Sequence, residues 1–183
     1  MLKYIITLLT IVSTVAASDF AVSQHNFKLS SGDFGMEVRE MLNTRKDHIQ
    51  FGYNGIADLS LEYRYADAEQ TENRLRATYE LYTWQWVTLS PRLEYRLFED
   101  DGMKVRFRQI IDIEVPVHDK VTLWAELQPG LTFNKLRIDT QTRIGAYYKI
   151  KPNVLIGPFL QMNTNKNFDR ESSWLGTNLV IDF

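Results

Sequence analysis

The chain has 183 residues, is 44% hydrophobic and 13% aromatic, and carries a formal charge of −2 with no cysteine. This composition excludes a disordered chain, and the lack of cysteine excludes disulfide scaffolds and cysteine–zinc sites. A charge this close to neutral is not typical of a nucleic-acid-binding domain, so we expect no nucleic-acid partner.

The N-terminal segment predicts export from the cytoplasm. Lys3 gives a short positive start, an apolar run follows, and Ala16 and Ala17 supply the small residues expected before a cleavage site. The run is well short of the ~20 residues that a membrane-spanning helix needs. We therefore expect a signal peptide over 1–17, followed by an N-terminal extension over 18–33. For residues 20–29 the sequence allows two interpretations, a short extra strand or a plain extension.

From residue 34 onward the chain alternates between apolar and polar side chains. In the segment 103–115, one parity carries no charge, whereas the other carries Lys104, Arg106, Arg108, Asp112 and Glu114. Successive strand side chains point to opposite faces, so this pattern predicts a β-strand with one charge-free face. The same contrast predicts ten strands, near residues 34–42, 47–53, 56–65, 73–83, 86–98, 103–115, 121–133, 140–150, 154–164 and 173–183.

The links between these strands are short, and Asn54-Gly55 is a strong signal for a two-residue hairpin turn. Short links join antiparallel neighbours. The sequence thus predicts an all-β fold over 34–183, an antiparallel up-and-down β-barrel of about ten strands, with eight or twelve as alternatives. An even number of strands places both termini on the same side.

Alternation alone does not say which face of the barrel is inside. A soluble periplasmic ligand-binding barrel would bury the apolar parity, whereas an outer-membrane barrel turns it toward lipid. The long charge-free faces and the aromatic residues near strand ends, such as Tyr63, Tyr65, Trp84 and Trp86, favour the membrane.

The last strand ends in an alternating apolar series that finishes on Phe183, which resembles the closing strand that barrel-assembly machinery recognises in bacterial outer-membrane proteins. We interpret the chain as a monomeric barrel in the outer membrane of a Gram-negative bacterium. Its expected partners are outer-membrane lipid, lipopolysaccharide and the barrel-assembly machinery.

If the apolar parity faces lipid, the other parity lines the lumen and is rich in cations. The candidate solute-binding residues are Arg64, Arg74, Arg76, Arg92, Arg96, Lys104, Arg106, Arg108 and Arg143. Most of them fall in the outer half of one wall, facing the amides of Gln128, Gln141 and Gln161. Since the guanidinium fork suits carboxylate and phosphate, the sequence predicts a narrow channel for small anions or acidic oligosaccharides.

A closed barrel with a structural or binding role is the alternative. Over the whole lumen, eleven basic residues face nine acidic ones by parity, and buried charges in proteins are normally paired. Such a near balance is what a lumen filled by salt bridges would show.

The inward arginines, the hairpin 48–65 and the segment 89–96 resemble the small monomeric porins for acidic oligosaccharides, the oligogalacturonate and sialic-acid channels. The similarity covers residues 49–108. It implies a twelve-stranded barrel with arginine tracks along the pore, and this chain is shorter, apparently by one hairpin.

An enzyme is not expected, although a hydrolase at the outer rim is carried as an alternative. Acidic residues and one histidine lie at or near the expected rim: Asp47, His48, Asp67, Asp100, Asp101, Asp139, Asp169 and Glu171. His48 and Asp47 are adjacent on a strand and so point apart. His25 and His118 lie elsewhere, and no Gly-x-Ser-x-Gly, His-Glu-x-x-His, phosphate-loop or dinucleotide-binding motif occurs. We therefore expect no catalytic residue, no metal site and no cofactor.

Overall fold

The computed structural model describes residues 22–42, 46–67, 71–133, 137–167 and 169–183. The signal peptide expected over 1–17 lies outside these ranges. No helix within the described ranges is long and apolar enough to cross a membrane. The strands are β1 (Val22–Ser31), β2 (Phe34–Leu42), β3 (Lys46–Ile56), β4 (Leu59–Asp67), β5 (Glu72–Tyr79), β6 (Tyr82–Trp84), β7 (Val87–Phe98), β8 (Gly102–His118), β9 (Val121–Thr132), β10 (Arg137–Lys151), β11 (Val154–Asn165) and β12 (Arg170–Asp182).

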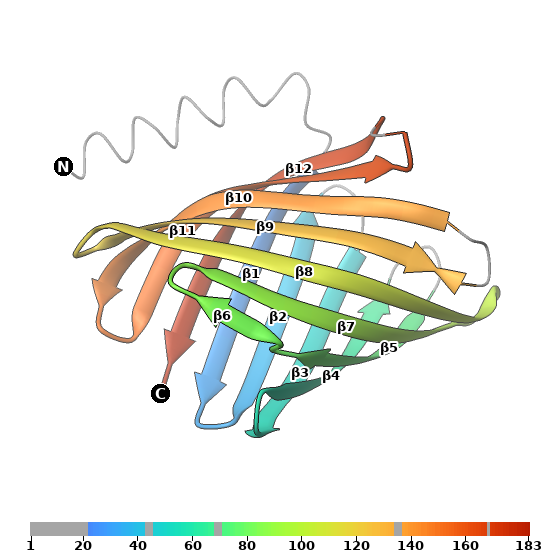
Figure 1. The fold of residues 1–183 in the computed structure, drawn as a ribbon, viewed down its shortest axis with the longest axis horizontal. Coiled ribbons are helices and arrows are strands. Elements are labelled where there is room, and N and C mark those ends of the chain that lie inside the picture. The colour runs from blue at the N-terminus through green and yellow to red at the C-terminus, as the bar shows by residue number, and fades with distance from the viewer. Residues whose placement is uncertain (1–21, 43–45, 68–70, 134–136, 168) are drawn as a thin grey trace.

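These strands form one closed sheet (Figure 1). Sequence neighbours pair in antiparallel fashion from β1 to β5 and from β7 to β12, and β5 pairs directly with β7. The short β6 pairs with β7 further along the same edge, so β5 and β6 occupy a single position in the wall. The result is a barrel of eleven strands, closed by β1 against β12.

The closure corrects the expected count of ten antiparallel strands. Val22–Ser31 is a strand of the barrel, and it pairs with β12 in parallel orientation. When eleven strands reverse direction one after another, the first and the last must run the same way. The start of β1 and the end of β12 therefore lie at opposite ends of the barrel, whereas an even number of strands would have put them at the same end.

Buried amides hold the parallel pair together from the inside. Asn26 Nδ2 donates to Asn178 Oδ1 at 2.7 Å, and Gln24 Nε2 donates to Asn26 Oδ1 at 2.8 Å. All three side chains are buried. Buried polar groups need partners, and here each amide supplies one to its neighbour.

The two ends of the barrel differ in their connections. At one end, here called the turn end, two-residue turns join the strands at 32–33, 57–58, 85–86, 119–120 and 152–153. The C-terminus lies there too, beside the hairpin of β1 and β2 (Figure 1), where Phe183 N donates to Ser30 O at 2.8 Å. The opposite end is called the loop end.

One of these turns is displaced from its expected place. β3 continues through Asn54-Gly55 to Ile56, and the register against β4 shifts between Tyr53 and Ile56. The chain reverses at 57–58, where Asp58 has a φ of 39°. The turn predicted at Asn54-Gly55 is therefore wrong, because the glycine lies in an irregular stretch of the strand.

The apolar parity faces outward. Phe51, Leu75 and Leu93 are about half exposed, whereas Arg74 and Glu94 on the other parity are buried. This confirms the predicted orientation and is the reverse of a barrel with an apolar lumen. Exposed large apolar side chains lie on each strand from β2 to β11.

Aromatic and glycine residues alternate across the inner wall near the middle of the strands. Trp124 pairs with Gly145, Gly145 with Phe159, and Phe159 with Gly176, from β9 to β12. The Trp124 ring stacks on Tyr147 with centroids 5.5 Å apart, and Phe159 is only 2% exposed. The glycines leave room for these rings to lie against the wall.

This packing makes Gly145 sensitive to substitution. A Cβ at Gly145 would lie 2.7 Å from the Trp124 ring and 2.7 Å from the Pro158 carbonyl oxygen. We expect Gly145→Ala to lower the free energy of unfolding by about 1–3 kcal/mol, as overpacking does. At Gly35 the nearest atom lies 3.8 Å away, so Gly35→Ala is the matched control and should be nearly neutral. Urea unfolding followed by tryptophan fluorescence measures both, and equal midpoints would contradict the prediction.

Candidate functional site

All nine predicted cationic residues line one cavity of about 570 Å³ in the half of the barrel nearer the loop end. The cavity reaches the surface beside Arg137 and Glu171, which are partly exposed at the loop end. Its lining is Gln24, Lys28, Glu37, Arg39, His48, Gln50, Glu62, Arg64, Arg74, Arg76, Arg92, Glu94, Arg96, Phe98, Lys104, Arg106, Arg108, Glu126, Gln128, Thr132, Arg137, Asp139, Gln141, Arg143, Gln161, Asn163, Glu171 and Trp174.

The charges of this cavity are not balanced. Among the described residues that line it, twelve are Lys or Arg and six are Asp or Glu. The near balance counted over the whole lumen does not apply here, because Asp58, Glu80 and Asp182 lie exposed toward the turn end. The cavity therefore concentrates positive charge.

Four basic residues form a continuous line across the wall, here called the cationic row. Arg64 on β4 pairs with Arg74 on β5, Arg74 with Arg96 on β7, and Arg96 with Lys104 on β8. Like charges directly opposite each other on neighbouring strands are destabilising. Carboxylates offset part of this repulsion, since Glu72 pairs with Arg74 and Arg96, and Asp101 pairs with Lys104.

One position closer to the turn end, charges alternate in what is here called the alternating row. Glu62, Arg76, Glu94 and Arg106 are successive partners from β4 to β8. Arg76 Nη1 lies 3.3 Å from Glu62 Oε2, and Arg76 Nε lies 3.5 Å from Glu94 Oε1. Opposite charges on neighbouring strands stabilise a sheet, so this row offsets part of the repulsion beside it.

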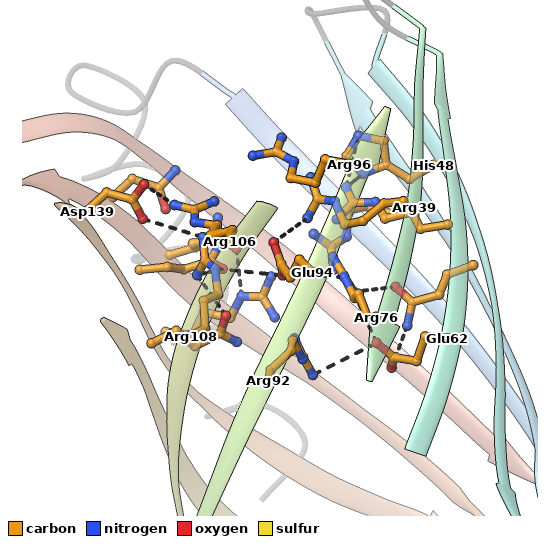
Figure 2. Close-up of a pocket in the computed structure, with 18 of the residues that line it drawn as sticks. Arg39, His48, Glu62, Arg76, Arg92, Glu94, Arg96, Arg106, Arg108 and Asp139 are labelled. Carbon is orange, nitrogen blue, oxygen red and sulfur yellow. Dashed lines mark hydrogen bonds and ion pairs between the residues drawn. The ribbon is translucent and has the colours of Figure 1, made fainter. Parts of the chain in front are cut away.

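Glu94 lies at the centre of the cluster and is 1% exposed (Figure 2). Besides Arg76, its carboxylate lies 3.6 Å from Arg74 Nη1 and 3.8 Å from Arg108 Nε. Its Oε2 has no hydrogen-bond partner in the described structure. Glu94 thus acts on several guanidinium groups through charge at moderate distance rather than through one close pair.

Glu72 binds two arginines of the cationic row at once. Arg74 Nε donates to Glu72 Oε1 at 2.7 Å, and Arg96 Nε donates to the same oxygen at 2.6 Å. Each guanidinium also donates from Nη2 to Oε2 at 3.0 Å. The sequence analysis missed Glu72 because it lies just outside the strand predicted over 73–83, although it has the inward parity of Arg74.

Lys28 and Asp139 line the cavity, and neither was among the predicted solute-binding residues. Lys28 lies on β1, in the segment 20–29 that the sequence allowed to be either a strand or an extension. Asp139, expected at or near the outer rim, lies on β10 close to the loop end, with an inward side chain that is only 13% exposed. It pairs with Arg106 and lies 3.5 Å from Arg108 Nη2.

Amide side chains line the wall across from the arginines. Gln128 Oε1 accepts a hydrogen bond from Arg108 Nη1 at 2.8 Å, and Gln161 Oε1 accepts one from Arg143 Nε at 2.7 Å. Arg143 also lies 3.2 Å from Glu126. The cavity therefore combines cations on one side with donors and acceptors suited to hydroxyl groups on the other.

A second cavity of about 420 Å³ lies at the turn end, lined by Pro116, Val117, His118, Asp119, Lys120, Thr122, Tyr147, Lys149 and Leu155. It shares no lining residue with the first. On β9, Trp124 lies between Thr122 of the second cavity and Glu126 of the first. On β11, Phe159 lies between Leu155 of the second cavity and Gln161 of the first, and the Tyr147 ring stacks on Trp124. These aromatic side chains therefore pack together on the inner wall, at a level between the linings of the two cavities.

The rim residues of the hydrolase alternative divide between the cavity, which His48, Asp139 and Glu171 line, and the exposed surface. His48 lines the cavity and contacts Arg64, whereas Asp47, Asp67 and Asp169 are exposed. No group of three or more His, Asp or Glu side chains in the described ranges is placed to hold a metal ion.

No protein-family model matches the chain, and a comparison with curated proteins finds no match.

Proposed function

We propose that the protein is an outer-membrane β-barrel of a Gram-negative bacterium and that it forms a narrow channel for small anions, including acidic oligosaccharides. The observation that carries this proposal is the cationic row, set in a cavity with twice as many basic as acidic lining residues. Repulsion between neighbouring cations of the row lowers the stability of the barrel. The same cations attract anions, which gives this arrangement a function. In a narrow lumen the field of these groups is focused, which raises the local concentration of anions.

The outer surface supports the membrane part of the proposal. Exposed apolar side chains lie on each strand from β2 to β11, and aromatic residues lie exposed toward both ends, with Tyr63 and Tyr65 nearer the loop end and Trp84 and Trp86 at the turn end. Aromatic residues prefer the two interfaces of a bilayer. In this reading the short turns face the periplasm, lipid and lipopolysaccharide surround a monomer, and barrel-assembly machinery inserts it.

The two walls of the cavity suit a solute with two kinds of group. A carboxylate would bind a guanidinium fork, and hydroxyl groups would exchange hydrogen bonds with Gln128, Gln141 and Gln161. Acidic saccharides carry both. The porins for such saccharides resemble this barrel in their inward arginines, and eleven strands in place of twelve give a narrower lumen.

A closed binding barrel is the second candidate function. The observation that favours it is the aromatic packing of Trp124, Tyr147 and Phe159 between the two cavities. In this case the same cations would bind an anion from the loop end without letting it pass.

Conductance in planar lipid bilayers tests the channel. Purified protein should give openings whose reversal potential in a KCl gradient shows preference for chloride, and galacturonate oligomers should block them more strongly than neutral maltose oligomers of equal length. Absence of openings, or a preference for potassium, would defeat the channel. Binding of galacturonate oligomers without openings would favour the closed barrel.

A further inference from the structure

Arg64 differs from every other arginine of the cavity. It is buried, with 8% of its surface exposed, yet no carboxylate of the described chain lies within 4.0 Å of its guanidinium. Each of the other nine lining arginines has such a carboxylate: Arg39, Arg74, Arg76, Arg92, Arg96, Arg106, Arg108, Arg137 and Arg143. Arg64 is therefore a buried cation with no carboxylate in contact in the described structure, and Glu72 acts on it only from beyond 4.0 Å.

The surroundings of Arg64 increase this imbalance. Its polar contact is with the His48 ring, where Nη2 lies 3.0 Å from Nε2, and its own Nε has no hydrogen-bond partner. The strongest charge repulsions on it come from Arg74, Arg39 and Arg76. Arg39 and His48 are paired neighbours on β2 and β3, and both face the cavity (Figure 2). Burial of an unpaired charge is costly unless a partner arrives.

Glu72 shows what such a partner would do. Its carboxylate receives Nε and Nη2 donors from both Arg74 and Arg96, the two arginines next to Arg64 in the cationic row. Arg64 has the same kind of donor, a buried Nε, with nothing to receive it. The missing element at this point of the row is one oxyanion.

We propose that Arg64 is the centre of a binding site for a single oxyanion, a carboxylate or a phosphate group, held against the wall of β2 to β5. Nε of Arg64 donates to the anion, and the neighbouring charges of Arg39 and Arg74 attract it. The site deepens the proposed function, since it gives an entering anion a place to stop. It does not require that the barrel conducts.

Thermal unfolding of the purified barrel in detergent tests the site. Sodium phosphate, sodium glucuronate and, as a neutral control, glucose are titrated at constant ionic strength with chloride as the background anion. A ligand that binds only the folded state raises the unfolding midpoint in a saturable manner. For the unsubstituted protein we expect this rise with phosphate, glucuronate or both, and none with glucose.

Arg64→Gln separates the site from a general effect of salt. In the absence of anion this variant should unfold at a higher temperature than the unsubstituted protein, because an unpaired buried charge is gone. Its apparent affinity for the anion should fall at least about tenfold, since the charge-assisted donor is lost. Arg170→Gln, at the exposed start of β12 and outside the cavity lining, is the matched control and should respond as the unsubstituted protein does.

The outcomes separate the site from the channel. An equal response in Arg64→Gln, or no response in the unsubstituted protein, would overturn the site whether or not the barrel conducts. A barrel that fails to conduct but shows a response dependent on Arg64 keeps the site and loses the channel. If Arg64→Gln does not fold, Arg64→Lys keeps the charge without the planar fork, and an affinity equal to that of arginine would overturn the proposal.

Discussion

Replacing Glu94 with glutamine is expected to lower the free energy of unfolding by about 3 kcal/mol, because removal of one member of a buried charge cluster leaves the others uncompensated. Arg74, Arg76 and Arg108 all lie within 3.8 Å of this carboxylate. Each of them keeps a second carboxylate, which limits the loss. Glutamine preserves the shape of the side chain, so the change isolates the charge.

Glu171→Gln is the control for this prediction. Glu171 also pairs with an arginine, but both side chains are well exposed, and exposed ion pairs contribute about 0–1 kcal/mol. Urea unfolding of the two variants in the same detergent measures the difference. Equal stabilities would show that Glu94 does not hold the cluster together.

In bilayers, Glu94→Gln should also strengthen the preference for anions, since it raises the net positive charge of the cavity.

The second large effect concerns selectivity. Joint replacement of Arg74 and Arg96 with glutamine removes half of the cationic row and leaves Glu72 without its two partners. Focused positive potential raises local anion concentration by about 10- to 1000-fold, so we expect the ratio of chloride to potassium permeability to fall by about tenfold. Reversal potentials in a KCl gradient measure this ratio.

A double variant with unchanged net charge serves as the control. Glu72→Gln combined with Arg74→Gln removes one charge of each sign from the same place. The permeability ratio of this variant should stay close to that of the unsubstituted protein. The ratio of the variant that lacks both Arg74 and Arg96 should be lower. Equal ratios for the two would mean that the row does not set selectivity.

The alternation of the sequence predicted the wall of the barrel well, because the side-chain period of a strand is a local property. Arg74 and Arg76 point inward and Leu75 outward simply because they are neighbours on β5. For the same reason all nine predicted cations reached one cavity. Nothing beyond a few consecutive residues was needed to place them.

The eleventh strand and the closing pair lay beyond such local evidence. β1 alternates polar residues with residues such as His25 and Phe27, so its two faces contrast weakly. Which strand completes a barrel depends on pairing between the two ends of the chain. No pattern within β1 or β12 states that they run parallel.

The rows of the site were also out of reach of the sequence. That Arg64 lies opposite Arg74 depends on the register between β4 and β5, which the turns and register shifts set. A register shifted by two residues would leave each side chain on the same face of the sheet. It would nevertheless place Arg64 opposite a different residue. The alternation along each strand identified the inward cations. Only the pairing between strands shows that four of these cations are neighbours and that Glu94 lies among arginines.

The parallel meeting of β1 and β12 has a consequence for how the barrel is assembled. Asn26 and Asn178, which bond across it, are separated by 152 positions, so this contact closes nearly the whole chain into a ring. Until it forms, the nascent sheet keeps two open edges, and unpaired edges invite pairing with other chains. Parallel pairing is slightly weaker per residue than antiparallel pairing. We therefore expect this junction, held from the inside by the Asn26–Asn178 hydrogen bond, to be the pairing that completes the barrel during assembly.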